Sequence, residues 1–76
     1  MDRIKTTSDI AKLVKKSRKD AGFTQTELAG LCNTGVRFIV DLEAGKPTCQ
    51  IEKVLHILNM LGIRLVVNCK EIKNGK

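Results

Sequence analysis

The sequence contains no long apolar segment. No run of apolar residues approaches the roughly 20 residues that a helix needs to span a bilayer. The first residues also lack the continuous apolar core of a secretory signal peptide. We therefore expect a cytoplasmic protein with no membrane partner.

Residues that commonly bind metals or perform catalysis are also scarce. The cysteines Cys32, Cys49 and Cys69 are odd in number and far apart, unlike the closely spaced pairs of zinc sites. These three cysteines are better interpreted as small buried residues of a protein in a reducing cell. His56 is the sole histidine, and there is no Ser/His/Asp set or phosphate-binding glycine loop. The sequence therefore predicts no metal, no cofactor and no enzymatic activity.

The length and charge of the chain indicate how many domains it has and what kind of partner it binds. The chain has 76 residues and a formal net charge of +6. A chain of this length forms one small domain near the lower size limit for a hydrophobic core, so dimerisation would supply additional burial. The charge favours a polyanionic partner such as nucleic acid, although many small basic proteins bind nothing specific.

The segment 23–46 has the pattern of two short helices joined by a tight turn. Thr24 and Glu27 have the spacing of a capping box, and Phe23 and Leu28 occupy the two positions of a hydrophobic staple. The first helix of the pair should therefore begin at Gln25. It should end near Asn33, because asparagine tolerates a left-handed backbone better than most residues.

The second helix of the pair carries two different faces. Its apolar stripe is predicted to consist of Phe38, Ile39 and Leu42. The opposite face carries Val36, Arg37, Val40 and Asp41. Arginine can donate two hydrogen bonds to guanine, and small apolar groups can contact a thymine methyl, so this face suits a DNA major groove. The arrangement predicted is a helix-turn-helix.

The rest of the chain extends this unit to four main helices and one strand. An all-α fold is expected, with helices at about 8–21, 25–32, 36–44 and 49–61. A Thr/Ser cluster should cap the first helix, and Thr48 the fourth. The fourth should bury an apolar stripe of Ile51, Val54, Leu55, Leu58 and Leu61. Residues 70–76 are predicted to be a frayed, basic tail.

After Gly62 the pattern changes to that of a strand, at about 63–69. It contains Ile63, Leu65, Val66, Val67 and Cys69. A lone strand leaves its backbone groups unpaired, and the same strand from a second copy can pair with them across a two-fold axis. The sequence therefore predicts a homodimer.

The chain resembles the lambda-repressor-like (XRE) helix-turn-helix family over about residues 8–62. The resemblance is carried by Arg18, Gly22, Thr24-Gln25, Leu28-Ala29, Ile39, Leu42-Glu43 and Gly45-Lys46. The segment 37–48, followed by one long helix and by Leu61-Gly-Ile-Arg-Leu-Val-Val67, is similar to the HipB-type antitoxins encoded beside HipA-type kinase toxins. The strand predicted at about 63–69 is similar to the C-terminal strand that HipB-type proteins use for dimerisation.

The resemblance also assigns roles to individual residues. It implies a structural ion pair between Arg18 and Glu43, and a phosphate contact by Gln25. Thr24, Thr34 and Lys46 are further candidates for contacts with the DNA backbone. The base-reading candidates are Val36, Arg37, Val40 and Asp41, with Arg37 the favoured guanine contact. The alternative is that Arg37 and Asp41, four residues apart, pair with each other on the helix surface.

Three functional hypotheses follow. The first is a HipB-type antitoxin that binds a roughly palindromic operator in double-stranded DNA, represses its own operon and binds a HipA-like serine/threonine kinase toxin. The second is a stand-alone XRE or phage-type regulator without a toxin. The third is a protein-interaction module on the same fold, which the exposed valines of the 36–44 helix suggest.

Overall fold

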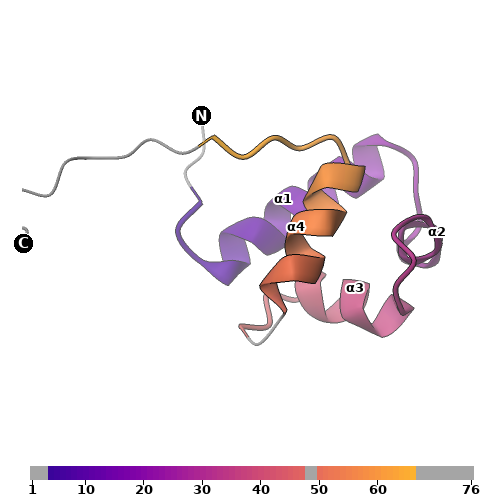
Figure 1. Cartoon of the computed structure of the whole chain (residues 1–76), viewed down its shortest axis with the longest axis horizontal. Helices are drawn as coiled ribbons and strands as arrows, with labels where there is room; N and C mark the ends of the chain where they lie inside the picture. The colour runs from indigo at the N-terminus through magenta and orange to yellow at the C-terminus, as the bar shows by residue number, and fades with distance from the viewer. Residues whose placement is uncertain (1–3, 48–49, 67–76) are drawn as a thin grey trace, which may run out of the picture.

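The predicted order of four helices is confirmed. The computed structural model describes residues 4–47 and 50–66. Its helices are α1 (Thr7–Asp20), α2 (Gln25–Leu31), α3 (Val36–Glu43) and α4 (Ile51–Met60). In Figure 1, α4 crosses in front of α1, and α3 lies below, with α2 seen nearly end-on beside it. Helix α3 packs against both α1 and α2.

The first two helices begin with complete capping boxes. Thr6 caps α1, with its hydroxyl accepting from the Asp9 amide at 3.1 Å, and the Asp9 carboxylate accepts from the Thr6 amide in return. Thr24 and Glu27 form the same reciprocal pair at α2, at 3.0 and 2.8 Å. Each box satisfies amides that the first turn of a helix leaves unpaired. The start of α2 at Gln25 is therefore confirmed.

All four helices end in the same hydrogen-bonded turn. Beyond each end, one residue adopts a positive φ and two amides return to carbonyls of the last turn, which is the Schellman motif. At the end of α3, Gly45 donates to the Leu42 carbonyl and Lys46 to the Asp41 carbonyl, both at 3.1 Å. The left-handed residues are Gly22, Asn33, Gly45 and Gly62. The predicted turn at Asn33 is thus confirmed.

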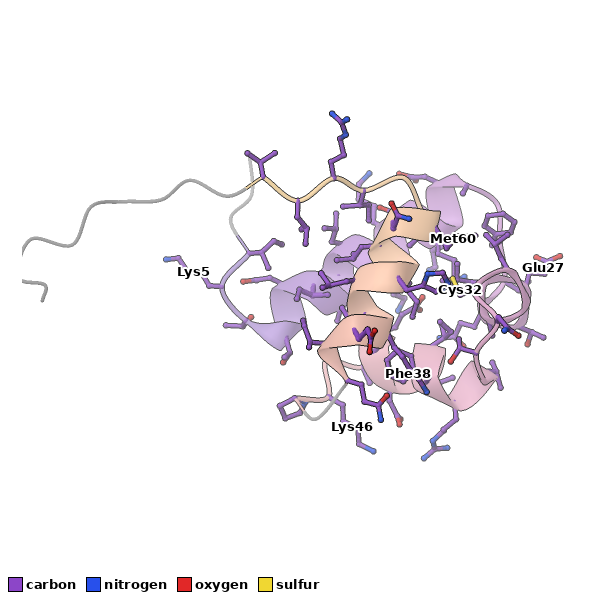
Figure 2. All side chains as sticks on the ribbon, viewed as in Figure 1. Lys5, Glu27, Cys32, Phe38, Lys46 and Met60 are labelled. Atoms are coloured by element: carbon purple, nitrogen blue, oxygen red, sulfur yellow. The ribbon has the colours of Figure 1, made fainter. Side chains whose placement is uncertain are left out.

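One cluster of buried apolar side chains joins the helices. Val14 of α1, Leu28 of α2, Ile39 of α3 and Ile57 of α4 have the largest fully buried side chains. Phe23 and Phe38 are half-buried and pack against this cluster, as the predicted staple and apolar stripe require. Cys32 also lies in the cluster, and burial raises the pKa of its thiol. Figure 2 shows its side chain inside the fold.

One prediction about α4 was wrong, and another was right only in part. Its N-cap is Gln50 rather than Thr48, and no side chain caps it. The first buried residue of α4 is Val54. Of the predicted stripe, Val54 and Leu58 are buried and Leu61 is half-buried against the core. Ile51 is 66% exposed and Leu55 is 45% exposed, and Ile57 is buried instead. The core-facing side of α4 is therefore rotated away from the predicted stripe.

The segment after α4 is extended but unpaired where it is described. Residues 63–66 run away from the end of α4, and they form no strand within the described chain (Figure 1). Ile63 is half-buried against the core, whereas Leu65 and Val66 are 53% and 84% exposed. The rest of the predicted strand, including Val67 and Cys69, and the predicted tail 70–76 lie outside the described residues.

Candidate nucleic-acid interface

Helices α2 and α3 form the predicted helix-turn-helix. The turn between them depends on Asn33, whose φ of 55° allows the Thr34 amide to reach the Ala29 carbonyl at 2.9 Å. Gly35 then caps α3 without a side-chain hydrogen bond. The buried residues of α2 and α3 face the shared core, and this fixes the angle at which α3 is presented to solvent.

A buried ion pair connects this unit to α1. The Nε and Nη2 groups of Arg18 bind the two carboxylate oxygens of Glu43 at 2.6 and 3.0 Å, with 9% and 3% of the two side chains exposed. The remaining Nη1 group donates to the Phe23 carbonyl at 2.8 Å. Hydrogen bonding to Glu43 raises the pKa of Arg18 above its usual value. The predicted structural pair is therefore confirmed.

Sequence reasoning missed a third member of this network. The Nε2 group of Gln25, at the start of α2, donates to Oε1 of Glu43 at 3.1 Å. Gln25 and Glu43 are far apart in sequence, so no local pattern predicted that they would meet. The amide nitrogen of Gln25 carries two hydrogens, and one hydrogen bond leaves the other available. The Gln25 side chain is thus oriented by the same carboxylate that orients α1.

A second missed contact ties the end of α3 to the start of α1. The Thr7 hydroxyl donates to the Gly45 carbonyl at 2.9 Å. The sequence had presented Thr7 as one member of a capping cluster, and a hydroxyl gives no signal of so distant an acceptor. The connection after α3 is therefore held from two sides, by Thr7 and by the Schellman bonds of Gly45 and Lys46.

The outward face of α3 carries the predicted base-reading residues. Val36 and Val40 are 42% and 37% exposed, so this face presents apolar surface to solvent. The Arg37 side chain is 82% exposed. Asp41 is only 26% exposed, and its carboxylate lies between two cations. The face is therefore mixed, with apolar and cationic groups reaching furthest into solvent.

The alternative pairing of Arg37 with Asp41 is present in the structure. Oδ1 of Asp41 lies 3.4 Å from Nε of Arg37, and Oδ2 lies 3.6 Å from Nζ of Lys46. The Lys46 contact was missed, because it depends on the turn at Gly45. Figure 2 shows Lys46 projecting from the connection after α3. The predicted backbone contact Lys46 and the predicted reader Arg37 thus bind one carboxylate.

The predicted backbone-contact residues of α2 lie at its two ends. Thr24 is exposed at the N-terminus, where its hydroxyl accepts the Glu27 amide and keeps its own hydrogen free to donate. Gln25 is half-buried beside it, and Thr34 is half-buried in the turn before α3. These side chains and the first amides of α2 are donors of the kind that bind phosphate oxygens.

The part of the chain that the structure describes contains neither a cluster of metal ligands nor a membrane-spanning helix. Within residues 4–47 and 50–66, no three His, Cys, Asp or Glu side chains are grouped as metal ligands. Over the same residues, no helix has both the length and the apolar character required to cross a membrane.

Comparison with known proteins identifies one strong sequence relative. No protein-family model matches the chain. The sequence is 60% identical over 60 residues to a Sinorhizobium fredii (strain NBRC 101917 / NGR234) protein named uncharacterized HTH-type transcriptional regulator y4mF. The match covers 79% of each protein.

Solved structures of low sequence identity share the fold. A HipB chain in a HipB-O4 20mer complex has a TM-score of 0.81 and 21% identity, over 93% of this chain and 100% of that one. A chain of a HipA-HipB-O2-O3 complex gives the same values. A chain of a HipB-O1-O2 complex has a TM-score of 0.83 and 22% identity, over 91% and 100% of the two chains.

Proposed function

Since this chain belongs to the HTH-type transcriptional regulators, we propose that it represses its own promoter by binding a palindromic operator as a homodimer. The observation that carries the proposal is the outward face of α3, where Val36, Arg37 and Val40 are exposed on a helix fixed by the buried Arg18–Glu43 pair. Arg37 donates to guanine, and the two valines contact thymine methyl groups.

Contacts with the DNA backbone position α3 relative to the base pairs. Gln25 donates its second amide hydrogen to a phosphate while Glu43 holds the first. The Thr24 hydroxyl donates to the same strand, and Thr34 and Lys46 bind phosphates on either side of α3. These four contacts carry no sequence information, but they add to affinity and make it depend on salt.

The dimer uses the extended segment after α4. Ile63, Leu65 and Val66, continued by Val67 and Cys69 outside the described residues, pair with the same segment of a second copy. The exposure of Leu65, Val66, Ile51 and Leu55 supports this pairing, because a partner would cover this apolar surface. The two α3 helices then enter successive major grooves about 34–36 Å apart, which requires a palindromic operator.

We further propose that the protein is the HipB-type antitoxin of a toxin–antitoxin operon, with a HipA-like serine/threonine kinase as its partner. The proposal is supported by the fold that the chain shares with HipB over more than nine-tenths of its length. It is tested by the adjacent gene and by co-purification. An adjacent HipA-like gene whose product co-purifies with this chain supports the antitoxin role. An unrelated neighbour favours a stand-alone regulator.

The DNA-binding proposal is tested by fluorescence anisotropy. The full chain is titrated into a duplex from upstream of its own gene and into a scrambled duplex, at two salt concentrations. Arg37→Ala is expected to weaken operator binding by about 1–3 kcal/mol. Lys15→Ala, which removes the same charge from the exposed face of α1, is the matched control and should change operator binding little. Equal, salt-insensitive binding of both duplexes would instead support an interaction module.

A further inference from the structure

The Asp41 carboxylate separates two cations on the DNA-facing side of α3. Its Oδ1 lies 3.4 Å from Nε of Arg37, and its Oδ2 lies 3.6 Å from Nζ of Lys46. The exposed fractions of the Arg37, Lys46 and Asp41 side chains are 82%, 54% and 26%. Both cations therefore extend further into solvent than the carboxylate that pairs with them.

The atoms involved determine what Arg37 can still do. The contact of Asp41 with Arg37 is an ion pair at Nε, and within residues 4–47 and 50–66 no hydrogen bond of either Arg37 Nη group is found. A guanidinium can donate through both Nη groups to the O6 and N7 atoms of guanine. Arg37 can thus read guanine without leaving Asp41. An ion pair at Nε also restricts the rotation of a long side chain in part, so less entropy is lost on binding.

The Lys46 side of the arrangement is held by the backbone. The Lys46 amide donates to the Asp41 carbonyl at 3.1 Å, after the left-handed turn at Gly45. The Gly45 carbonyl in turn accepts the Thr7 hydroxyl. Lys46 is therefore anchored next to Asp41, and its ammonium group is kept apart from Arg37 by the carboxylate between them.

A direct reading role suits Asp41 poorly. Its side chain is only 26% exposed and each oxygen faces a cation, whereas contact with the amino group of cytosine requires the carboxylate to reach the groove floor. Its negative charge also repels the phosphates of every sequence equally. An exposed i,i+4 pair adds little to helix stability, so stability does not account for the arrangement either.

We propose that Asp41 is a positioning residue, which orients Arg37 for guanine and lowers affinity for DNA of any other sequence. The inference rests on the proposed operator binding. Asp41 acts through Arg37 and Lys46: it fixes the guanidinium that reads, and it offsets the charge that would otherwise bind phosphates indiscriminately. The specificity of the regulator then depends on a residue that contacts no base.

The test compares the full chain with Asp41→Asn, Asp41→Glu, Arg37→Ala and the double variant Arg37→Ala with Asp41→Asn. Each is titrated against the upstream duplex, its single-base-pair variants and the scrambled duplex at two salt concentrations. Asp41→Asn should bind scrambled DNA more tightly and lower the operator-to-scrambled affinity ratio by about tenfold. The lost discrimination should fall on the base pair at which Arg37→Ala also loses it.

Three further readouts exclude a merely structural role. Asp41→Glu keeps the charge within reach of Arg37 and should restore most of the discrimination. In the Arg37→Ala background, Asp41→Asn should leave discrimination at that base pair unchanged, because the residue through which it acts is gone. Melting temperatures of all four variants should stay near that of the parent chain.

Three outcomes would overturn the inference. Equal loss of affinity for both duplexes by Asp41→Asn would show a general role in folding or binding. Undiminished loss of discrimination in the Arg37→Ala background would make Asp41 an independent base reader. If the parent chain itself does not distinguish the two duplexes, the proposed operator binding fails, and the inference fails with it.

Discussion

Arg18 of α1 and Glu43 of α3 form a two-point ion pair from which water is almost completely excluded, at 2.6 and 3.0 Å. The same carboxylate accepts from Gln25, and the same guanidinium donates to the Phe23 carbonyl. Every polar atom of the pair is therefore occupied, and no buried side-chain nitrogen or oxygen in the described chain lacks a partner. Hydrogen bonds to every polar atom offset the cost of removing these two charges from water.

Removing one partner of this pair should destabilise the protein strongly. Glu43→Ala leaves the Arg18 guanidinium buried without a counter-charge, and we expect a loss of about 3 kcal/mol or more in the free energy of unfolding. Lys16→Ala breaks the exposed Lys16–Asp20 pair, whose side chains are 76% and 67% exposed, and is the control. It should change the free energy of unfolding little. Urea denaturation measures both, and similar losses would contradict the structural role assigned to Glu43.

The capping threonine of α2 should matter more than its neighbour in the helix. Thr24→Ala removes the acceptor of the Glu27 amide and should cost about 1 kcal/mol, whereas Thr24→Ser should retain most of the cap. Thr26 is exposed in the first turn and makes no side-chain hydrogen bond within the described chain. Thr26→Ala should therefore change stability by less than about 0.5 kcal/mol, in the stabilising direction. Thermal denaturation distinguishes the two, and a harmless Thr24→Ala would argue against the capping box.

Asp9 should make stability depend on acidic pH. Hydrogen bonds from the Lys5 and Thr6 amides hold the pKa of its carboxylate below the ordinary value of 3.8. A lowered folded-state pKa contributes stability above the unfolded pKa, and this contribution is lost as pH falls through the folded value. Asp9→Asn should therefore be less stable than the parent chain at pH 6, and the difference should disappear well below 3.8. Melting curves across this range test the sign, and a difference that grew on acidification would refute it.

Two glycines should respond to alanine in opposite directions. Gly45 has a φ of 79°, and an added Cβ would lie 3.5 Å from the Ser8 Cα, which is ordinary contact. Gly45→Ala should thus cost about 1–2 kcal/mol through the left-handed backbone alone. Gly30 lies within α2 without a positive φ and with open space around its Cβ position. Gly30→Ala should stabilise the protein by about 0.5–1 kcal/mol. Losses of the same size in both variants would show that backbone conformation is not the cause.

The apolar residues of α4 did not define a single buried face in the sequence. Ile51, Val54, Leu55, Ile57 and Leu58 all fit helical spacing, so more than one stripe can be drawn through them. The packing of α4 against the other helices selects Val54, Ile57 and Leu58. Ile51 and Leu55 remain exposed on the adjacent face, which is the surface assigned above to a second copy.

The sequence by itself determined the structural features that involve residues close together in the chain, namely the helix ends and the faces of α3. Thr24 and Glu27 define the start of α2, and Asn33, Gly45 and Gly62 define where helices end, because caps and left-handed turns involve groups only a few positions apart. The exposed and buried faces of α3 also followed from its periodicity. The Arg18–Glu43 pair was anticipated from family resemblance, and its geometry agrees.

Only the tertiary structure decided the contacts between distant residues. Gln25 meets Glu43 and Thr7 meets Gly45 because α1, α2 and α3 converge on one core, and no local pattern encodes that meeting. Asp41 is a local case by contrast: its pairing with Arg37, four residues away, was one of the sequence-based alternatives, and its contact with Lys46 depends on the left-handed turn at Gly45. Local hydrogen bonding is encoded at short range, whereas polar contacts between helices depend on how their apolar faces pack.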